Sequence, residues 1–337
     1  IELTRALFVH GEGKPPPLSN ESWQGWAQSI LANLYCLNGQ PHRAVPLYEN
    51  VIDISARNKA DKSKINLGMG LGSLAQTVQI PTGALIKAER NLILRIELGK
   101  ELGENWTIDN GLRELALLLA IRGIIEESRK TIEEAITLAQ KINNVQNQGL
   151  AWAYRALQFF IDARSNKSRI ENLNLAFVSA QRALELADED ARINVPVPVD
   201  HTRAYWLLGK AYRKNHDLIK AYENLSKAMI ICRQYNIVYF EADILLDLAH
   251  LHYDQKNYEE AKSLADEALT ITERCGYVLQ GADVNLFIAQ YALEQEQDKA
   301  KAKQYAEEAK KLATCDGPPY YYKVAYEEAE RFLEKLK

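Results

Sequence analysis

The feature that most constrains this chain is a recurring pattern of small and large side chains at helical spacing. Its clearest copy places seven side chains along two predicted helices: Tyr205, Leu208, Gly209 and Tyr212, then Ala221, Leu225 and Ala228. Small residues let two helices cross closely, and the larger ones fill the space around the crossing. Helical periodicity runs almost throughout, and strand-type alternation is missing, so the pattern predicts an all-α fold of repeated hairpins.

Six further stretches follow the same pattern. A small residue opens the core-facing stripe of the second helix in each of the seven copies, at Ala44, Ala84, Ser128, Ala176, Ala221, Ala261 and Ala302. Successive copies are separated by 40 to 48 residues. This regular spacing predicts about seven stacked hairpins, each of which needs its neighbours to bury its apolar face.

The pattern resembles the tetratricopeptide repeat (TPR), a helical hairpin of 34 residues. The resemblance implies a right-handed superhelical α-solenoid of about seven elongated hairpins. We expect residues 1–20 to be the end of a preceding helix with a proline-rich linker, and residues 21–316 to be the repeat array. Residues 317–337 should form a C-terminal capping helix, because Ala325, Ala329 and Phe332 fall on one apolar stripe.

Three stretches, residues 21–40, 273–281 and 312–329, resemble the TPR regions at the C-termini of bacterial STAND-type signal-transduction NTPases. In that family the array is the sensor or clamp of a switch whose NTPase module lies N-terminal. The chain starts at Ile1 and carries no G-x-x-x-x-G-K-[ST] motif, so we expect it to be part of a longer protein. A free-standing TPR adaptor is the alternative.

Charge and cysteine usage narrow the function classes. The 41 Lys and Arg residues are balanced by 45 Asp and Glu residues, giving a net charge of −4. This balance provides no general attraction to membranes or nucleic acid, so single-stranded nucleic acid is a disfavoured ligand. The cysteines Cys36, Cys232, Cys275 and Cys315 lack metal-ligand spacing, and no apolar run is long enough to span a membrane. We therefore expect a cytoplasmic protein with reduced thiols.

A candidate binding groove follows from the helical register. On the first helix of each hairpin, the positions opposite the buried stripe should line the concave face. The predicted partner-binding residues are Arg113, Arg155, Trp206, Lys210, Arg213, Lys214, His250, Tyr253, Phe287 and Tyr291, and the same register places Trp26 and Met69 near the N-terminus. The middle of the groove is basic and its C-terminal third aromatic, which favours an acidic peptide or protein surface. Alternatively, the basic residues balance acidic neighbours on the second helices.

Other constellations have competing interpretations. Asp247, His250 and Asp254 share one helical face and could hold a metal, although a solvated polar stripe is the preferred interpretation. The glycines of residues 68–72 could suggest a nucleotide loop, but a preceding strand is missing, and packing is preferred. No catalytic constellation is evident, so we expect neither an enzyme nor a cofactor. The predicted partner is a protein or peptide, or another domain of the same full-length chain.

Overall fold

The computed structural model describes residues 1–57, 60–165 and 168–337, and these residues form an all-α array of paired helices. A short helix, α1 (Glu2–Arg5), precedes the array. The hairpins are α2 (Glu21–Leu37) with α3 (Pro41–Arg57), α4 (Asp61–Leu74) with α5 (Leu85–Leu102), α6 (Asn105–Ile121) with α7 (Ile125–Ile142), α8 (Val145–Asp162) with α9 (Arg169–Ile193), α10 (Pro198–Lys214) with α11 (Leu218–Gln234), α12 (Val238–Asp254) with α13 (Tyr258–Cys275), and α14 (Val278–Glu294) with α15 (Lys299–Ala313). A last helix, α16 (Lys323–Lys335), packs on α15 and α14. The predicted all-α repeat fold is confirmed.

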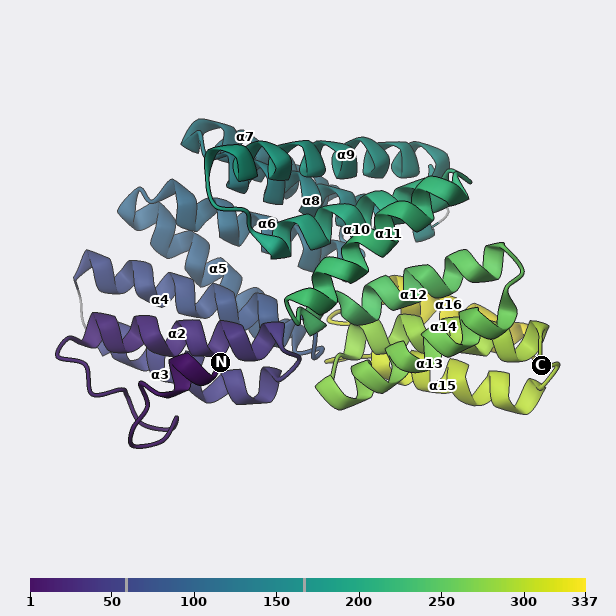
Figure 1. Ribbon diagram of the computed structural model, residues 1–337, viewed down its shortest axis with the longest axis horizontal. Coiled ribbons are helices and arrows are strands. Elements are labelled where there is room, and N and C mark those ends of the chain that lie inside the picture. The colour runs from purple at the N-terminus through teal and green to yellow at the C-terminus, as the bar shows by residue number, and fades with distance from the viewer. Residues whose placement is uncertain (58–59, 166–167) are drawn as a thin grey trace.

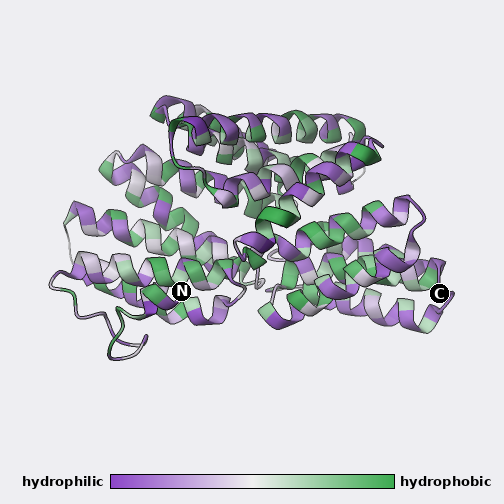
Figure 2. Ribbon diagram, viewed as in Figure 1, coloured by the Kyte–Doolittle hydropathy of each residue, from purple (hydrophilic) through white to green (hydrophobic). Residues whose placement is uncertain are grey.

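Close helix crossings explain why the small residues recur. A Cβ atom added to Gly209 of α10 would lie 2.7 Å from Leu225 Cγ and 3.0 Å from the Leu225 backbone nitrogen in α11. Ala221 and Ala228 of α11 are fully buried beside this crossing. Figure 2 shows hydrophobic and hydrophilic residues alternating along the helices, as expected when one face of each helix is buried.

The repeats are longer than the 34-residue unit because the helices themselves are long. Most of them contain 17 or 18 residues, and α9 contains 25. Two turns of irregular helix extend the first helices of two hairpins, the π-helix η1 (Ala75–Gln79) after α4 and the 3-10 helix η2 (Ala163–Ser165) after α8. Pro46 lies exposed inside α3.

The array closes on itself through the turns of its hairpins (Figure 1). The Tyr277 hydroxyl donates to the carbonyl of Cys36 at 3.3 Å, and the Val278 amide donates to the carbonyl of Pro81 at 2.7 Å. Farther along, the Ile86 amide donates to the Asp316 carboxylate at 2.8 Å. We call these contacts the seam. They join the first two hairpins to the last two, so the concave face is not one continuous open groove.

Near the seam, the inner face of the third hairpin is occupied by buried ion pairs. Arg95 of α5 pairs with Glu114 of α6 (Nη1–Oε2, 3.3 Å), and Arg113 pairs with Asp109 (Nη1–Oδ2, 2.6 Å). A Cβ atom on Gly72 would lie 1.9 Å from Arg95 Nη1. This glycine therefore makes room for a guanidinium group, and the packing interpretation of residues 68–72 accounts for it.

We predict that Gly209→Ala destabilises the fold, whereas Gly25→Ala, at another helical glycine, stabilises it. A methyl group at position 209 meets the backbone of α11, but nothing lies within 4 Å of a Cβ atom at position 25. Helix propensity alone favours alanine by about 0.5–1 kcal/mol. Thermal unfolding of the two variants should therefore shift in opposite directions, and a rise in Tm for both would contradict the crossing geometry.

A second pair of glycines tests the seam. Gly39 and Gly103 both have positive φ, +71° and +69°, so alanine strains the backbone by about 1–2 kcal/mol at either site. Only at Gly39 would the added Cβ also meet the opposite end of the array, 2.7 Å from Cys275 Sγ and from Val238 Cγ1. We expect Gly39→Ala to lower Tm further and to increase the radius of gyration in small-angle scattering. Equal scattering by both variants would argue against a seam that holds the array closed.

Candidate functional site: a basic pocket on the concave face

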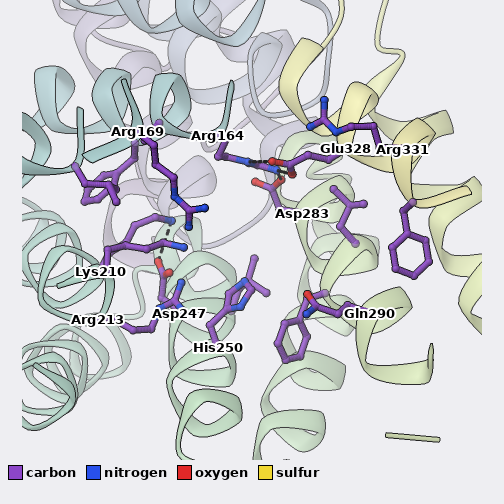
Figure 3. A pocket seen from close by; sticks show the side chains of 18 residues that line it. Arg164, Arg169, Lys210, Arg213, Asp247, His250, Asp283, Gln290, Glu328 and Arg331 are labelled. Atoms are coloured by element: carbon purple, nitrogen blue, oxygen red, sulfur yellow. Dashed lines mark hydrogen bonds and ion pairs between the residues drawn. The ribbon is translucent and has the colours of Figure 1, made fainter. Parts of the chain in front are cut away.

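The site is a cavity of about 370 Å³ between the first helices of the later hairpins. Its lining comes from the end of α8 with η2, the start of α9, and from α10, α12, α14 and α16. In Figure 3, Arg169, Lys210 and Asp247 lie on one side of the cavity, and Arg164, Asp283 and Glu328 lie on the other. Stacking of consecutive hairpins thus brings together residues that are far apart in the sequence.

One side of the cavity, which we call the basic wall, carries four cations: Arg169 at the start of α9, and Lys210, Arg213 and Lys214 on α10. The three α10 residues share a face because they are three and four positions apart. Lys210 Nζ lies 3.1 Å from Asp247 Oδ2, and Arg213 Nη1 lies 2.9 Å from Asp254 Oδ2.

The two remaining cations, Arg169 and Lys214, have no carboxylate partner among the described residues. Two carboxylates face four cations, so the wall keeps a formal charge of about +2. This excess is local, because the whole chain carries −4.

Two hydrogen bonds hold the Asp247 carboxylate in place. The buried indole of Trp206 donates a hydrogen bond from Nε1 to Asp247 Oδ2 at 2.8 Å, and the same oxygen accepts from Lys210. Lys210 Nζ also lies 5.7 Å from the ring centroids of Trp206 and Phe160, within cation–π distance. A charged hydrogen bond and aromatic contacts therefore hold Lys210 against the wall.

Lys214 is different. Burial lowers its pKa to about 7, and the neighbouring charges of Arg213, Lys210 and Arg169 act in the same direction against a partial opposition from Asp247. Burial, together with the charges of Arg213, Lys214, Lys210 and Arg164, holds the pKa of His250 well below its usual range. Burial and the repulsion among the cations thus both disfavour protonation here, and an anion placed at the wall would offset the repulsion.

The opposite side of the cavity is already neutralised. Arg164 Nη2 lies 2.8 Å from Asp283 Oδ1 of α14 and 2.6 Å from Glu328 Oε2 of α16, and its Nη1 donates to the Tyr322 hydroxyl at 2.6 Å. These contacts also tie α16 to the middle of the array. Arg331 of α16 lines the same side and has no carboxylate partner among the residues that the structure describes.

Aromatic side chains close the C-terminal side of the pocket. The rings of His250 and Phe287 meet edge to face at a centroid distance of 4.7 Å, and Tyr253 lies 5.9 Å from Phe287 and 6.3 Å from Tyr291. Phe287 and Tyr291 are buried. The aromatic region expected from the sequence is therefore one cluster, with His250 and Phe287 lining the cavity and Tyr253 and Tyr291 supporting them.

The structure brings together most of the predicted groove residues, but not all. Lys210, Arg213, Lys214, His250 and Phe287 line the cavity. Trp206 is buried beneath it.

Two predicted groove residues lie elsewhere. Arg113 is buried in its pair with Asp109, and Arg155 points to the second helices, where it pairs with Glu133 (2.7 Å) and donates to Ser179. The surroundings of Arg155 match the alternative interpretation, in which a basic residue balances an acidic neighbour on a second helix.

The stripe considered for a metal is engaged in ion pairs, since Asp247 contacts Lys210 and Asp254 contacts Arg213. Within residues 1–57, 60–165 and 168–337, no three His, Cys, Asp or Glu side chains are arranged to hold a metal ion. None of the helices in these ranges is long and apolar enough to cross a membrane.

Sequence reasoning missed the contributions of α8, α9 and α16. Arg164 and Arg169 lie on either side of the turn between η2 and α9, where the repeat pattern assigns no helical register. Glu328 and Arg331 lie in the helix expected only to cap the array. The sequence did contain one signal for α16. Glu328 and Arg331 are three residues apart and therefore share a face of the helix, and Phe332 of the same helix also lines the cavity.

A second cavity, of about 750 Å³, lies at the N-terminal end between α2, α3 and α4. Trp23, Trp26 and Met69 line it, and the two indoles meet edge to face at 5.7 Å. Trp23 and Trp26 remain more than half exposed, at 58% and 54%. Trp26 and Met69, which the helical register placed near the N-terminus of the predicted groove, both line this cavity.

Comparisons with known proteins agree with the repeat architecture. Residues 242–274 match the family model described as "Tetratricopeptide repeat". A search of curated proteins gives no match. The structure of a Rap protein complexed with Competence and Sporulation Factor is similar at 14% identity and a TM-score of 0.60, over 95% of this chain and 86% of that chain.

Two further solved structures are similar. Yeast Tom70 matches at 18% identity and a TM-score of 0.53, over 94% of this chain and 64% of its own. A STAND protein with a tetratricopeptide repeat sensor from Pyrococcus horikoshii matches at 17% identity and a TM-score of 0.46, over 95% of this chain and 50% of its own. At these identities the likeness concerns the fold. The seven hairpins, the small-residue crossings and the matched repeat together identify this chain as a TPR-like helical repeat protein.

Proposed function

We propose that this protein is an interaction module that binds an acidic segment of a partner protein in the basic pocket, and that it acts by binding and not by catalysis. The observation that carries the proposal is the basic wall, where Arg169 and Lys214 stand without a carboxylate in an otherwise acidic protein. A negatively charged ligand would be attracted to the basic wall, and a higher salt concentration would shorten the distance over which this attraction acts.

The surroundings of the wall suit a peptide better than a free ion. Phe160, Leu173, Phe287 and Phe332 also line the cavity, so apolar side chains flanking an acidic residue would find contacts. Aromatic and arginine side chains often dominate binding free energy at protein interfaces. The Rap and Tom70 likenesses support a TPR-like fold but do not name a ligand for this chain.

The finer proposal is that the array is the sensor or clamp of a larger signalling NTPase, as the resemblance to STAND proteins suggests. A partner that binds one arrangement of the array better than another would shift the whole protein towards that arrangement. The coding sequence upstream of Ile1 tests this. A G-x-x-x-x-G-K-[ST] motif there would support the sensor, and an initiator methionine within a few residues would favour a free-standing adaptor.

We predict that reversing the two unpaired charges, in Arg169→Glu/Lys214→Glu, abolishes binding of a fluorescently labelled hexaglutamate peptide. Anisotropy titrations at two salt concentrations measure this, and the wild-type affinity should fall as salt is raised. The matched control is Lys303→Glu/Lys311→Glu on α15, which changes the net charge equally at exposed positions outside the pocket. Equal losses in both variants would mean that net charge, and not the pocket, attracts the peptide.

A further inference from the structure

The charge of the basic wall specifies its ligand more closely than "acidic". With Lys214 protonated, the four cations and two carboxylates leave two positive charges in one small cavity. The cations approach from different elements, since Arg169 begins α9 while Lys210, Arg213 and Lys214 end α10. Arg213 also has a buried Nε–H group with no hydrogen-bond acceptor. The wall therefore has fewer carboxylates than cations, and it holds a buried donor without an acceptor.

We propose that the basic wall holds a compact dianionic group, namely a phosphoryl group carried by a side chain of the bound segment. This inference rests on the proposed function and names the group that anchors the segment. A phosphoryl group supplies about −1.5 to −2 charges at pH 7 and three strong acceptor oxygens on one tetrahedral centre. Arginine is well suited to such a group because its planar fork can donate two parallel hydrogen bonds.

A carboxylate fits the same wall less well. One glutamate or aspartate would leave about one positive charge unmatched, and it offers a single planar pair of oxygens. Two carboxylates on adjacent residues of an extended segment point to opposite sides of its backbone, and those of residues i and i+2 share a side but start about 6.6 Å apart, so neither pair supplies two charges on one centre. A single phosphoryl group places both charges within the cavity of about 370 Å³.

The protonation state of the Lys214 amine can report whether such a ligand is bound. The charged and titratable groups that face it are Arg164 of η2, Arg169 of α9, Lys210 and Arg213 of α10, Asp247 and His250 of α12, Asp283 of α14, and Glu328 and Arg331 of α16. With a pKa of about 7 its amine is partly neutral at neutral pH. A bound dianion favours the charged amine, so its pKa rises and binding takes up a proton. Affinity should therefore fall as pH rises from 7 to 9, where the phosphoryl group itself stays dianionic.

Competitive acetylation of the full 337-residue chain by trace acetic anhydride tests the proposal, because only neutral amines react. Mass spectrometry would follow Lys214 together with Lys303, an exposed lysine of α15 that serves as the internal control. The probes are N-acetyl-O-phosphoserine amide, N-acetylglutamate amide and sulfate, at constant ionic strength. We expect Lys214 alone to acetylate with a midpoint near pH 7, and phosphoserine to protect it at concentrations about tenfold lower than glutamate, a difference of about 1.4 kcal/mol.

Sulfate keeps its two charges at every pH used, so its protection of Lys214 should weaken from pH 7 to pH 9 through the titration of the wall alone. In Arg169→Gln the preference for phosphoserine over glutamate should be lost, whereas Lys303→Gln should keep it. A 5′-phosphorylated dinucleotide completes the series. Stronger protection by the dinucleotide than by phosphoserine would overturn the assignment to a side-chain phosphoryl group.

Equal protection by phosphoserine and glutamate, or no protection by either, would overturn the dianionic assignment. The hexaglutamate titration separates this failure from failure of the proposed function. If hexaglutamate binds in the pocket but phosphoserine is not preferred over glutamate, the protein is a module for acidic segments whose basic wall does not distinguish phosphoryl groups from carboxylates. Loss of both would remove the pocket as a binding site.

Discussion

The whole structure depends on how closely the two helices of each hairpin approach. At the crossing of α10 and α11 the missing side chain of Gly209 lets the helix lie directly against the backbone at Leu225. This distance sets the angle at which the next hairpin stacks, because side chains of one helix pack into grooves of its neighbour. Stacking in turn places Lys210, Asp247 and Phe287, from three successive hairpins, around one cavity. A local steric requirement thus determines the geometry of a distant site.

Burial then decides which part of the concave face is available. The charged side chains of α6 are buried among its neighbours α4, α5 and α8, where they pair with one another and with Arg95 instead of with solvent. Burial raises the pKa of Asp109 to about 6 despite the opposing charges of Arg113 and Arg95. Buried pairs of this kind contribute little net stability, because desolvation offsets their attraction, but removal of one partner is costly. This region is therefore structural. The described cations that line the cavity without a carboxylate partner are Arg169 and Lys214 on the wall and Arg331 on α16 opposite it.

Local patterns in the sequence were enough to predict the repeats and the face of α10 that lines the cavity. Lys210, Arg213 and Lys214 share a helical face by spacing alone, so their common direction follows from the period of an α-helix. Arg113 occupies an equivalent register, yet it is buried, because Asp109 of its own helix and Tyr154 of α8 enclose it, and no local pattern reveals such contacts. Arg164 and Arg169 were missed because the turn between α8 and α9 has no fixed register relative to the repeat.

The uncompensated charge of the wall is informative because folding alone gives no reason to keep it. Like charges held close together are unfavourable, and partial burial makes them more so. Since the pKa of Lys214 is lower in the folded chain than in the unfolded one, the unfolded chain binds more protons between pH 7 and its ordinary pKa. Folding stability should therefore rise with pH across that window, which means that protonated Lys214 opposes folding near neutral pH. A ligand that matches the charge would offset this repulsion, and binding to the folded chain alone would in turn stabilise the fold.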